Sequence, residues 1–441
     1  MAQLAIQDHP NRYALANELH ARPFPEVDPP CRAAHLAIKK PGAAADRDRS
    51  LDFAHLVALL DRYGAAHPAP GANHYSGKLG RGFLKWEMHT EFVTYTLFVD
   101  QTADEPFSGR LFDLFPADWL AAAPGACVSS CIVEVESVAP EDLAERLETF
   151  LPRWFVMESV AASRVLDGDA VIMADFRIDE NGHSRMAVFA HPAIGRRRLG
   201  RVMQRLVEIE TYKAMAMLTL PQARMVASAV ARLDRDLSGI VAGMAGQQGG
   251  EGETLDQLLK MAAEIEHLAS AAAFRFGAAG AYEAIVSQRI QVLREERIGG
   301  RQLFSEFMMR RFDPAMRTCR SAKERLDELS ARAERASDLL RTRVDVANQA
   351  QNVEVLRAMD RRAALQLRLQ ETVEGLSVVA ISYYAVNLVA GLLGPAGERI
   401  GLEKPAILAA LTVPVVLVVW LMVRRIRARA ADRREKTPPH G

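Results

Sequence analysis

The hydrophobic residues of this chain follow two different periods, and the change from one to the other falls near residue 195. Before it, residues 31–39 and 126–137 have the character of β-strands, and residues 83–100 are rich in aromatic and β-branched residues, as strands are. Amphipathic segments of helical period, such as residues 49–64, lie between them. We therefore predict an α+β domain of mixed strands and helices over residues 1–194.

Beyond residue 195 the apolar residues recur at every third or fourth position, which is typical of α-helices. A first helical region, residues 195–312, contains a glycine-rich break at residues 242–253. Residues 313–375 then continue as one helix with no stop signal, since Gly375 is their only glycine. A helix of this length needs packing partners, so we expect a coiled-coil stalk through which copies of the chain form a homo-oligomer.

Two long segments near the C-terminus contain no charged residue. As helices, residues 376–394 and 406–423 would each span roughly 27–28 Å at about 1.5 Å per residue, close to the hydrocarbon thickness of a bilayer. Two buried core helices are the alternative. The short connecting loop, residues 395–405, favours a transmembrane hairpin, so we expect the lipid bilayer to be a partner.

Basic residues determine the expected orientation of this hairpin. The tail, residues 424–441, holds seven Lys and Arg residues, and four arginines between residues 357 and 368 precede the first segment. The loop carries only Arg399 and Lys404. By the positive-inside rule, both termini and the bulk of the chain are cytoplasmic, and the loop lies outside.

Composition and charge exclude several classes of function. The 441 residues include 55 Lys plus Arg and 55 Asp plus Glu, so the net charge predicts no polyanionic partner. Four cysteines are too few for a disulfide scaffold. Five arginines between residues 196 and 205 open one helix, where an anionic neighbour or a solvated basic face accounts for them. No aromatic residues are interleaved with them, so we expect no nucleic-acid partner.

The candidate chemistry gathers in the N-terminal domain, which holds nine of the 11 histidines. Residues 83–100 have the character of one or two strands, and a strand would place four polar residues on one face: Lys85, Glu87, His89 and Glu91. Such a face can bind a metal or supply an acid and a base. The alternative is the solvated face of a half-buried sheet. We identify no zincin, phosphate-loop, dinucleotide or nucleophile-elbow motif, so no catalytic residue, metal or cofactor is assigned and a non-enzymatic role is favoured.

A second candidate for ligand binding lies at residues 17–25, NELHARPFP. It holds three charged or titratable residues: Glu18, His20 and Arg22. His20 can face a cleft shared with His35 or His89. The alternative is a rigid structural brace, because the two prolines of this stretch force extended backbone around the aromatic residue between them. We favour the brace.

Four polar residues interrupt the first membrane segment: Ser382, Tyr383, Tyr384 and Asn387. Polar groups in lipid need partners, so we expect these side chains to face other helices or a water-filled path. Helix packing and pore lining both stay open.

Three blocks of the chain, residues 9–25, 84–92 and 370–389, resemble a family of bacterial membrane-anchored proteins known as domain of unknown function 3422. The resemblance runs over nearly the whole chain. It implies the bacterial inner membrane as the location. It implies no activity, because the family brings none that is established, and no catalytic residues are carried over from it.

The order of a mixed domain, a very long helix, a short outer loop and a basic tail is similar to that of CorA-type magnesium transporters. That family ends its first membrane helix with Gly-Met-Asn, whereas residues 385–395 here read AVNLVAGLLGP. The leading hypothesis is an oligomer of CorA-like architecture that conducts ions without the usual filter. The alternative is a membrane-anchored scaffold or sensor whose cytosolic domain binds a ligand or protein partner. An enzyme that uses the N-terminal histidines is the third.

Overall fold

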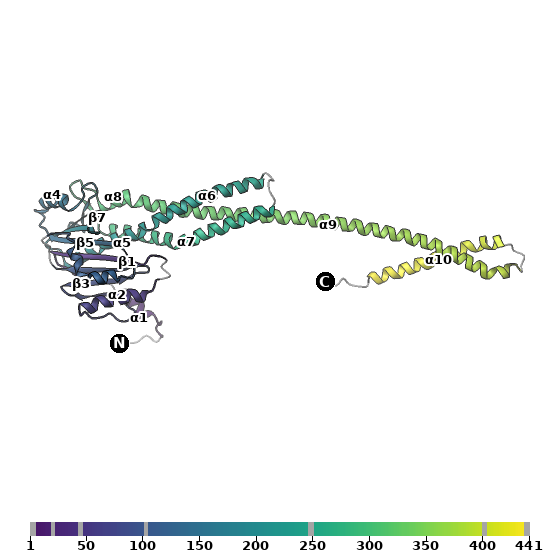
Figure 1. Ribbon diagram of the computed structural model, residues 1–441, viewed down its shortest axis with the longest axis horizontal. Coiled ribbons are helices and arrows are strands. Elements are labelled where there is room, and N and C mark those ends of the chain that lie inside the picture. Colours follow the sequence, from purple (N-terminus) through teal and green to yellow (C-terminus); the bar gives the residue numbers. More distant parts are fainter. Residues whose placement is uncertain are drawn as a thin grey trace. The chain divides into compact units, whose positions relative to one another are not determined.

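The computed structural model describes residues 6–18, 23–42, 47–100, 105–245, 251–398 and 404–435 (Figure 1). The chain divides into two compact units, Met1–Ser337 and Asp338–Gly441, which we describe one at a time. The first contains a β-sheet and its covering helices. The prediction of an α+β N-terminal domain followed by a long helix and a C-terminal helix is confirmed.

A nine-stranded sheet organises the first unit, in the order β2-β3-β4-β1-β5-β8-β7-β6-β9. Its strands are β1 (Cys31–Lys39), β2 (His74–Leu79), β3 (Gly82–Met88), β4 (Val93–Val99), β5 (Ala126–Ser137), β6 (Ala161–Val165), β7 (Ala170–Ile178), β8 (Ser184–Ala190) and β9 (Glu296–Arg297). β5 and β8 pair in parallel, and the other neighbours pair antiparallel. The parallel pair therefore joins two antiparallel halves into one sheet.

The helices divide between those that cover the sheet and those that form a bundle beside it. The chain contains α1 (Arg12–Glu18), α2 (Arg49–Arg62), the 3-10 helix η2 (Gly109–Leu114), α3 (Ala117–Ala121), α4 (Leu143–Trp154), α5 (Arg196–Met217), α6 (Thr219–Ala245), α7 (Glu251–Gln291), α8 (Phe304–Arg311), α9 (Asp313–Glu398) and α10 (Lys404–Glu435). The predicted glycine-rich break lies between α6 and α7, with its central residues outside the described ranges.

The two faces of the sheet differ in polarity. Side chains of a strand alternate between the faces, so Leu84 and Trp86 on β3 point into the large apolar core, where Leu59 of α2 and Trp119 of α3 join them. Lys85, between them on β3, lies on the opposite face, which meets α5. This second interface carries polar side chains where a core is usually apolar.

The start of α9 packs against the α6 and α7 hairpin within the first unit. Its buried side chains recur at helical spacing: Met316, Cys319, Ala322, Leu326, Leu329, Ala333 and Ala336. Ion pairs at the rim join Arg320 to Glu283 of α7 and Arg332 to Asp234 of α6. This part of the predicted stalk is therefore already covered by its own chain.

The second unit consists of α10 and of the part of α9 that follows Ser337. Two helical segments of the chain, within Asp313–Leu393 and at Leu408–Ile426, are long and apolar enough to cross a membrane. In these apolar segments, the buried side chains among those described are Ser382 and Val386 of α9 and Val419 of α10. Most of the described apolar surface of both segments is thus exposed in a single chain.

Candidate functional site

A small polar cavity lies between the sheet and α5. Its polar lining comes from three strands and one helix: His35, Lys85, Glu87, His89, Thr94, Thr96, Gln204, Glu208 and Thr211. The structure thus brings together four of the residues singled out in the sequence, from β1, β3 and the turn after β3: His35, Lys85, Glu87 and His89. The cavity has a volume of about 20 Å³, which is room for one water molecule and excludes an organic ligand.

The imidazole of His35 bridges the sheet and α5. Its Nδ1 lies 2.8 Å from Oγ1 of Thr96 on β4, and its Nε2 lies 2.8 Å from Oγ1 of Thr211 on α5. Burial, and to a smaller extent the positive charges of His89 and Lys85, lower the pKa of His35 to about 3. The ring is therefore neutral at neutral pH with both nitrogens hydrogen-bonded, which suits a structural bridge and does not suit a general acid or base.

A chain of alternating charges continues from the cavity to the helical hairpin. The buried Lys85 amine donates to Oε1 of Gln204 at 2.8 Å and lies 3.2 Å from Oε1 of Glu87. The Gln204 amide in turn donates to Glu208 at 2.7 Å, and Glu208 pairs with Arg289 of α7. Two cations balance two anions, so the network carries no net charge that would attract an ion.

The prediction that four polar residues share one strand face is wrong beyond residue 88. β3 ends at Met88, and the N–H of His89 donates to the carbonyl of Phe92 at 2.9 Å, which closes a tight turn. His89 still lines the cavity, where its ring stacks on Phe92 with the centroids 4.2 Å apart. The alternative of a solvated face is also wrong, because α5 covers Lys85 and its neighbours.

Glu91 leaves the cavity and contacts α7 instead. Its buried carboxylate accepts hydrogen bonds from both terminal nitrogens of Arg275, at 2.8 and 2.9 Å, and from the hydroxyl of Tyr282 at 2.6 Å. Lys39 adds a second cation at 3.8 Å. Burial and then the Glu91 carboxylate raise the pKa of the Tyr282 hydroxyl, which stays protonated as a donor. These contacts join the β3–β4 turn to the helical hairpin.

The second candidate stretch is described only in part. His20, Arg22 and the side chain of Glu18 lie outside the described residues. From Pro23 onward the chain runs as a strap over the start of α5, where Pro25 and Val27 are buried and Phe24 is 44% exposed. Pro25 and Val27 are the buried contacts of the strap, and the brace over residues 17–25 stays a prediction.

The arginines that open α5 are paired with acids of the same chain. Arg196 lies 2.9 Å from Asp28 and Arg197 lies 2.7 Å from Glu26, both on the strap. Arg198 lies 2.6 Å from Asp169. These carboxylates relieve the repulsion between the cations and the positive end of the helix dipole, so no external anion is required there.

Comparison with known proteins places the chain in a family. A family model described as protein of unknown function (DUF3422) matches residues 7–430. The chain belongs to the DUF3422 family. No curated protein matches it. The family description assigns no activity, so the function of this DUF3422 protein has to be inferred from its own geometry.

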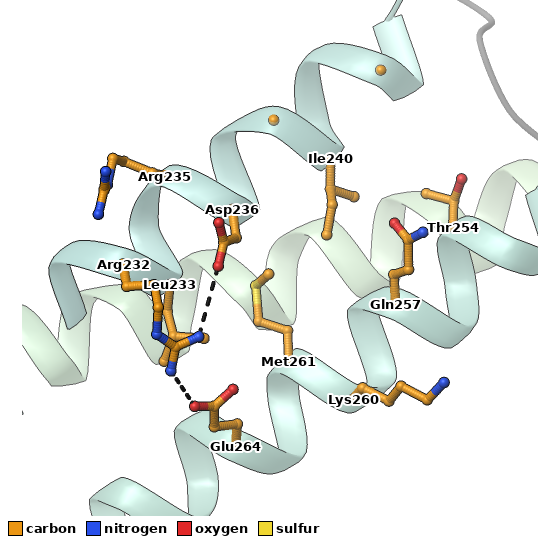
Figure 2. A pocket seen from close by; sticks show the side chains of 12 residues that line it. Arg232, Leu233, Arg235, Asp236, Ile240, Thr254, Gln257, Lys260, Met261 and Glu264 are labelled. Carbon is orange, nitrogen blue, oxygen red and sulfur yellow. Dashed lines mark hydrogen bonds and ion pairs between the residues drawn. The ribbon is translucent and has the colours of Figure 1, made fainter. Parts of the chain in front are cut away.

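A wide groove lies in the helical hairpin of the DUF3422 protein, where the sequence predicted no site. A groove of about 700 Å³ separates α6 from α7, floored by Leu233, Ile240 and Met261 (Figure 2). Arg232 at its rim pairs with Asp236 of α6 and with Glu264 of α7. The groove is open and its charges are largely paired with each other. Glycines at positions 239 and 243 were the sequence signal for this gap.

The polar residues of the first apolar segment divide between two faces of α9. Ser382 is buried, and its hydroxyl has no hydrogen-bond partner among the described residues. Tyr383 and Tyr384 are 67% and 68% exposed. Asn387 is also exposed and donates to the carbonyl of Tyr383 at 3.0 Å. In this DUF3422 protein, three polar side chains therefore point away from the buried face of the helix.

Metal binding finds no support in the described parts of the DUF3422 protein. No three His, Cys, Asp or Glu side chains in these parts are grouped closely enough to hold an ion. Of the predicted ligand-binding residues, His35 links the sheet to α5 and Glu91 links the sheet to α7.

Proposed function

We propose that this DUF3422 protein is an inner-membrane oligomer of CorA-like architecture in which α9 lines an ion-conducting path. The exposure of Tyr383, Tyr384 and Asn387 on an otherwise apolar helix carries the proposal. Polar side chains in lipid cost free energy unless they meet other helices or water. A ring of α9 helices around a narrow aqueous path supplies both.

The two apolar helices support membrane anchoring. Both are long enough to cross a bilayer, and basic residues flank them on the side of the N- and C-termini. By the positive-inside rule, the termini and the sheet domain face the cytoplasm and the short loop faces outward.

The middle of α9 supports assembly of several copies. Apolar side chains along it, including Val346, Leu356, Leu365 and Leu369, are between 60% and 63% exposed. Each square ångström of apolar surface removed from water contributes about 25 cal/mol, so neighbouring copies of α9 gain by covering these side chains. The same contacts bring the membrane segments of the copies together.

The placement of the polar residues around α9 supports a path between copies. Ser382 and Val386 lie one turn apart on the buried face, which we infer to be the face toward α10. At about 100° per residue, Tyr384 lies opposite this face and Asn387 lies roughly 120° from its centre. They are therefore available to other copies of the chain. The absence of Gly-Met-Asn from the sequence argues against magnesium selectivity.

Flux through liposomes tests this function. We expect the full-length protein to conduct at least one of K⁺, Mg²⁺ or protons, and Asn387→Leu or Tyr384→Phe to change the rate several-fold. Leu388→Ile, at an exposed apolar position of the same turn, is the matched control and leaves the flux unchanged. Correctly inserted protein that passes none of these cations would rule the proposal out.

The groove between α6 and α7 favours a second candidate, a membrane-anchored scaffold or sensor. An opening of about 700 Å³ can receive a ligand or a partner segment, whereas the His35 cavity cannot. A scaffold keeps its cellular role when an unrelated hairpin replaces residues 376–423. A conducting protein loses its role in the same exchange.

A further inference from the structure

A tryptophan and an arginine form a contact at the end of the apolar segment of α10. The guanidinium carbon of Arg424 lies 5.1 Å from the ring centroid of Trp420, one helical turn earlier. Trp420 is 48% exposed, and most of its neighbours on the apolar segment are exposed too. An indole with a cation just beyond it is typical of a helix that leaves the hydrocarbon core for the headgroup region.

Among the described residues, the positive charges at this point have no acidic partner. From Lys404 to Ala431 the sequence contains no Asp or Glu, so no acid lies one turn from Arg424 or Arg425. Across the described parts of the chain, neither arginine has an ion pair. The sequence continues with a further arginine three positions after Arg424. The local charge is therefore strongly positive and calls for an external anion.

We propose that Arg424 and Arg425, beside Trp420, bind the headgroup of a phospholipid of net negative charge. The inference rests on the proposed membrane anchoring and adds a lipid partner to it. A guanidinium offers parallel N–H donors that match two phosphate oxygens, and the indole packs against the acyl-chain boundary below. Two guanidiniums on adjacent positions cover neighbouring sectors of the helix, so they can hold one headgroup between them.

The association of spin-labelled lipids with the full-length protein in vesicles tests the inference. We expect wild type to prefer phosphatidylglycerol over phosphatidylcholine, by about five-fold for each arginine engaged. Arg424→Gln/Arg425→Gln lowers this preference by about five-fold for each arginine removed, while Arg424→Lys/Arg425→Lys keeps the charge and retains most of it. Arg361→Gln/Arg362→Gln is the matched control. These arginines precede Leu376 by at least 14 positions, roughly 21 Å of helix and well beyond a Debye length of about 8 Å, so the preference is unchanged.

The outcomes separate this inference from the function it rests on. A preference that Arg424→Gln/Arg425→Gln leaves unchanged, or that falls equally in the control, overturns the lipid site while leaving anchoring intact. Displacement of the lipid by inorganic phosphate at matched ionic strength would assign the site to a free anion and also overturn it. Flotation of all variants with zwitterionic vesicles establishes anchoring independently. Failure of wild type to float overturns both the anchoring and the lipid site.

Discussion

The carboxylate of Glu91 accepts a hydrogen bond from each terminal nitrogen of Arg275, although 184 positions separate the two residues. Glu91 lies in the turn between β3 and β4, and Arg275 lies on α7. The bidentate geometry fixes both the distance and the orientation of the helix relative to the turn. This pair is therefore the principal charged link between the sheet and the helical hairpin.

Glu91→Gln should destabilise the protein by about 3 kcal/mol. The substitution removes the charge but keeps the shape, and it leaves the Arg275 guanidinium, 14% exposed, without its bidentate partner. Urea unfolding of the full-length protein measures the loss of stability. Faster hydrogen exchange of the α7 amides around Tyr282 shows that the loss is located at this contact. Glu180→Gln, at an exposed position, should change the free energy of unfolding by less than about 0.5 kcal/mol. Equal effects of the two variants would contradict the assigned link.

His35 should make stability fall as the pH is lowered. Its folded pKa of about 3 lies below the ordinary value of 6.5, so between these values the unfolded chain binds a proton that the folded chain does not. The contribution of His35 to the free energy of unfolding is fully present above pH 6.5. It is lost toward pH 3, by about 1.4 kcal/mol per pH unit. His35→Gln removes this slope. The difference between variant and wild type at about pH 8, where both side chains are neutral, isolates the loss of packing and hydrogen bonding.

Glu134 should make the stability of the fold fall as the pH is raised, which is opposite to the effect of His35, over an overlapping range of pH. It is buried on β5 and accepts the N–H of Phe107 at 3.2 Å, and burial raises the pKa of its carboxyl to about 7 from 4.5. The folded chain therefore holds a proton that the unfolded chain lacks, and stability falls as the pH rises from 4.5 to 7. Glu134→Gln keeps an acceptor for Phe107 and removes the charge, so above pH 7 the variant should be more stable by roughly 3 kcal/mol.

Urea titrations at several pH values measure the Glu134 effect. The exposed Glu148→Gln serves as the control and should leave the slope unchanged. A Glu134→Gln variant that follows the wild-type slope between pH 4.5 and 7 would refute a raised pKa as the cause.

The strands that the sequence predicts well are those without a competing local signal. The residues predicted as strands at 31–39 and 126–137 coincide with β1 and β5. The Val and Ile residues of β5 favour a strand, whereas Ile38 is the only β-branched residue of β1. The long helix of residues 313–375 is likewise recovered within α9, since nothing in that stretch stops a helix.

The candidate site was predictable only in its residue types. The turn at His89 contains no glycine, proline or asparagine, so a strand period assigned through it places Glu91 on the wrong side. Its true partner Arg275 is too distant in sequence for any local pattern to indicate. α5 contributes Gln204 and Thr211 to a buried interface, and polar residues on a helix are ordinarily assigned to solvent. The signal that could have revealed this interface is the combination of polar side chains on one face of the strands with polar side chains along one face of α5.

A glycine substitution under the strap, compared with one on α6, tests the contact between the strap and α5. The two should change the free energy of unfolding in opposite directions. At Gly200 an added Cβ would lie 1.7 Å from the carbonyl oxygen of Pro25, so Gly200→Ala must displace the strap and should cost about 3 kcal/mol despite the better helix propensity of alanine. At Gly239 on α6 an added Cβ meets nothing within 4 Å, so Gly239→Ala should stabilise by up to about 1 kcal/mol. Urea unfolding measures both changes.

Hydrogen exchange locates the effect of Gly200→Ala. Backbone amides around Val27 should exchange faster in this variant because the strap no longer rests on the helix, while those of β1 stay protected. In Gly239→Ala the same amides should exchange as in wild type, since among the described residues the hydrogen bond and ion pairs of the strap go to the start of α5 and not to α6. An unchanged strap in Gly200→Ala would show that residues 23–28 contribute nothing to holding α5 against the sheet.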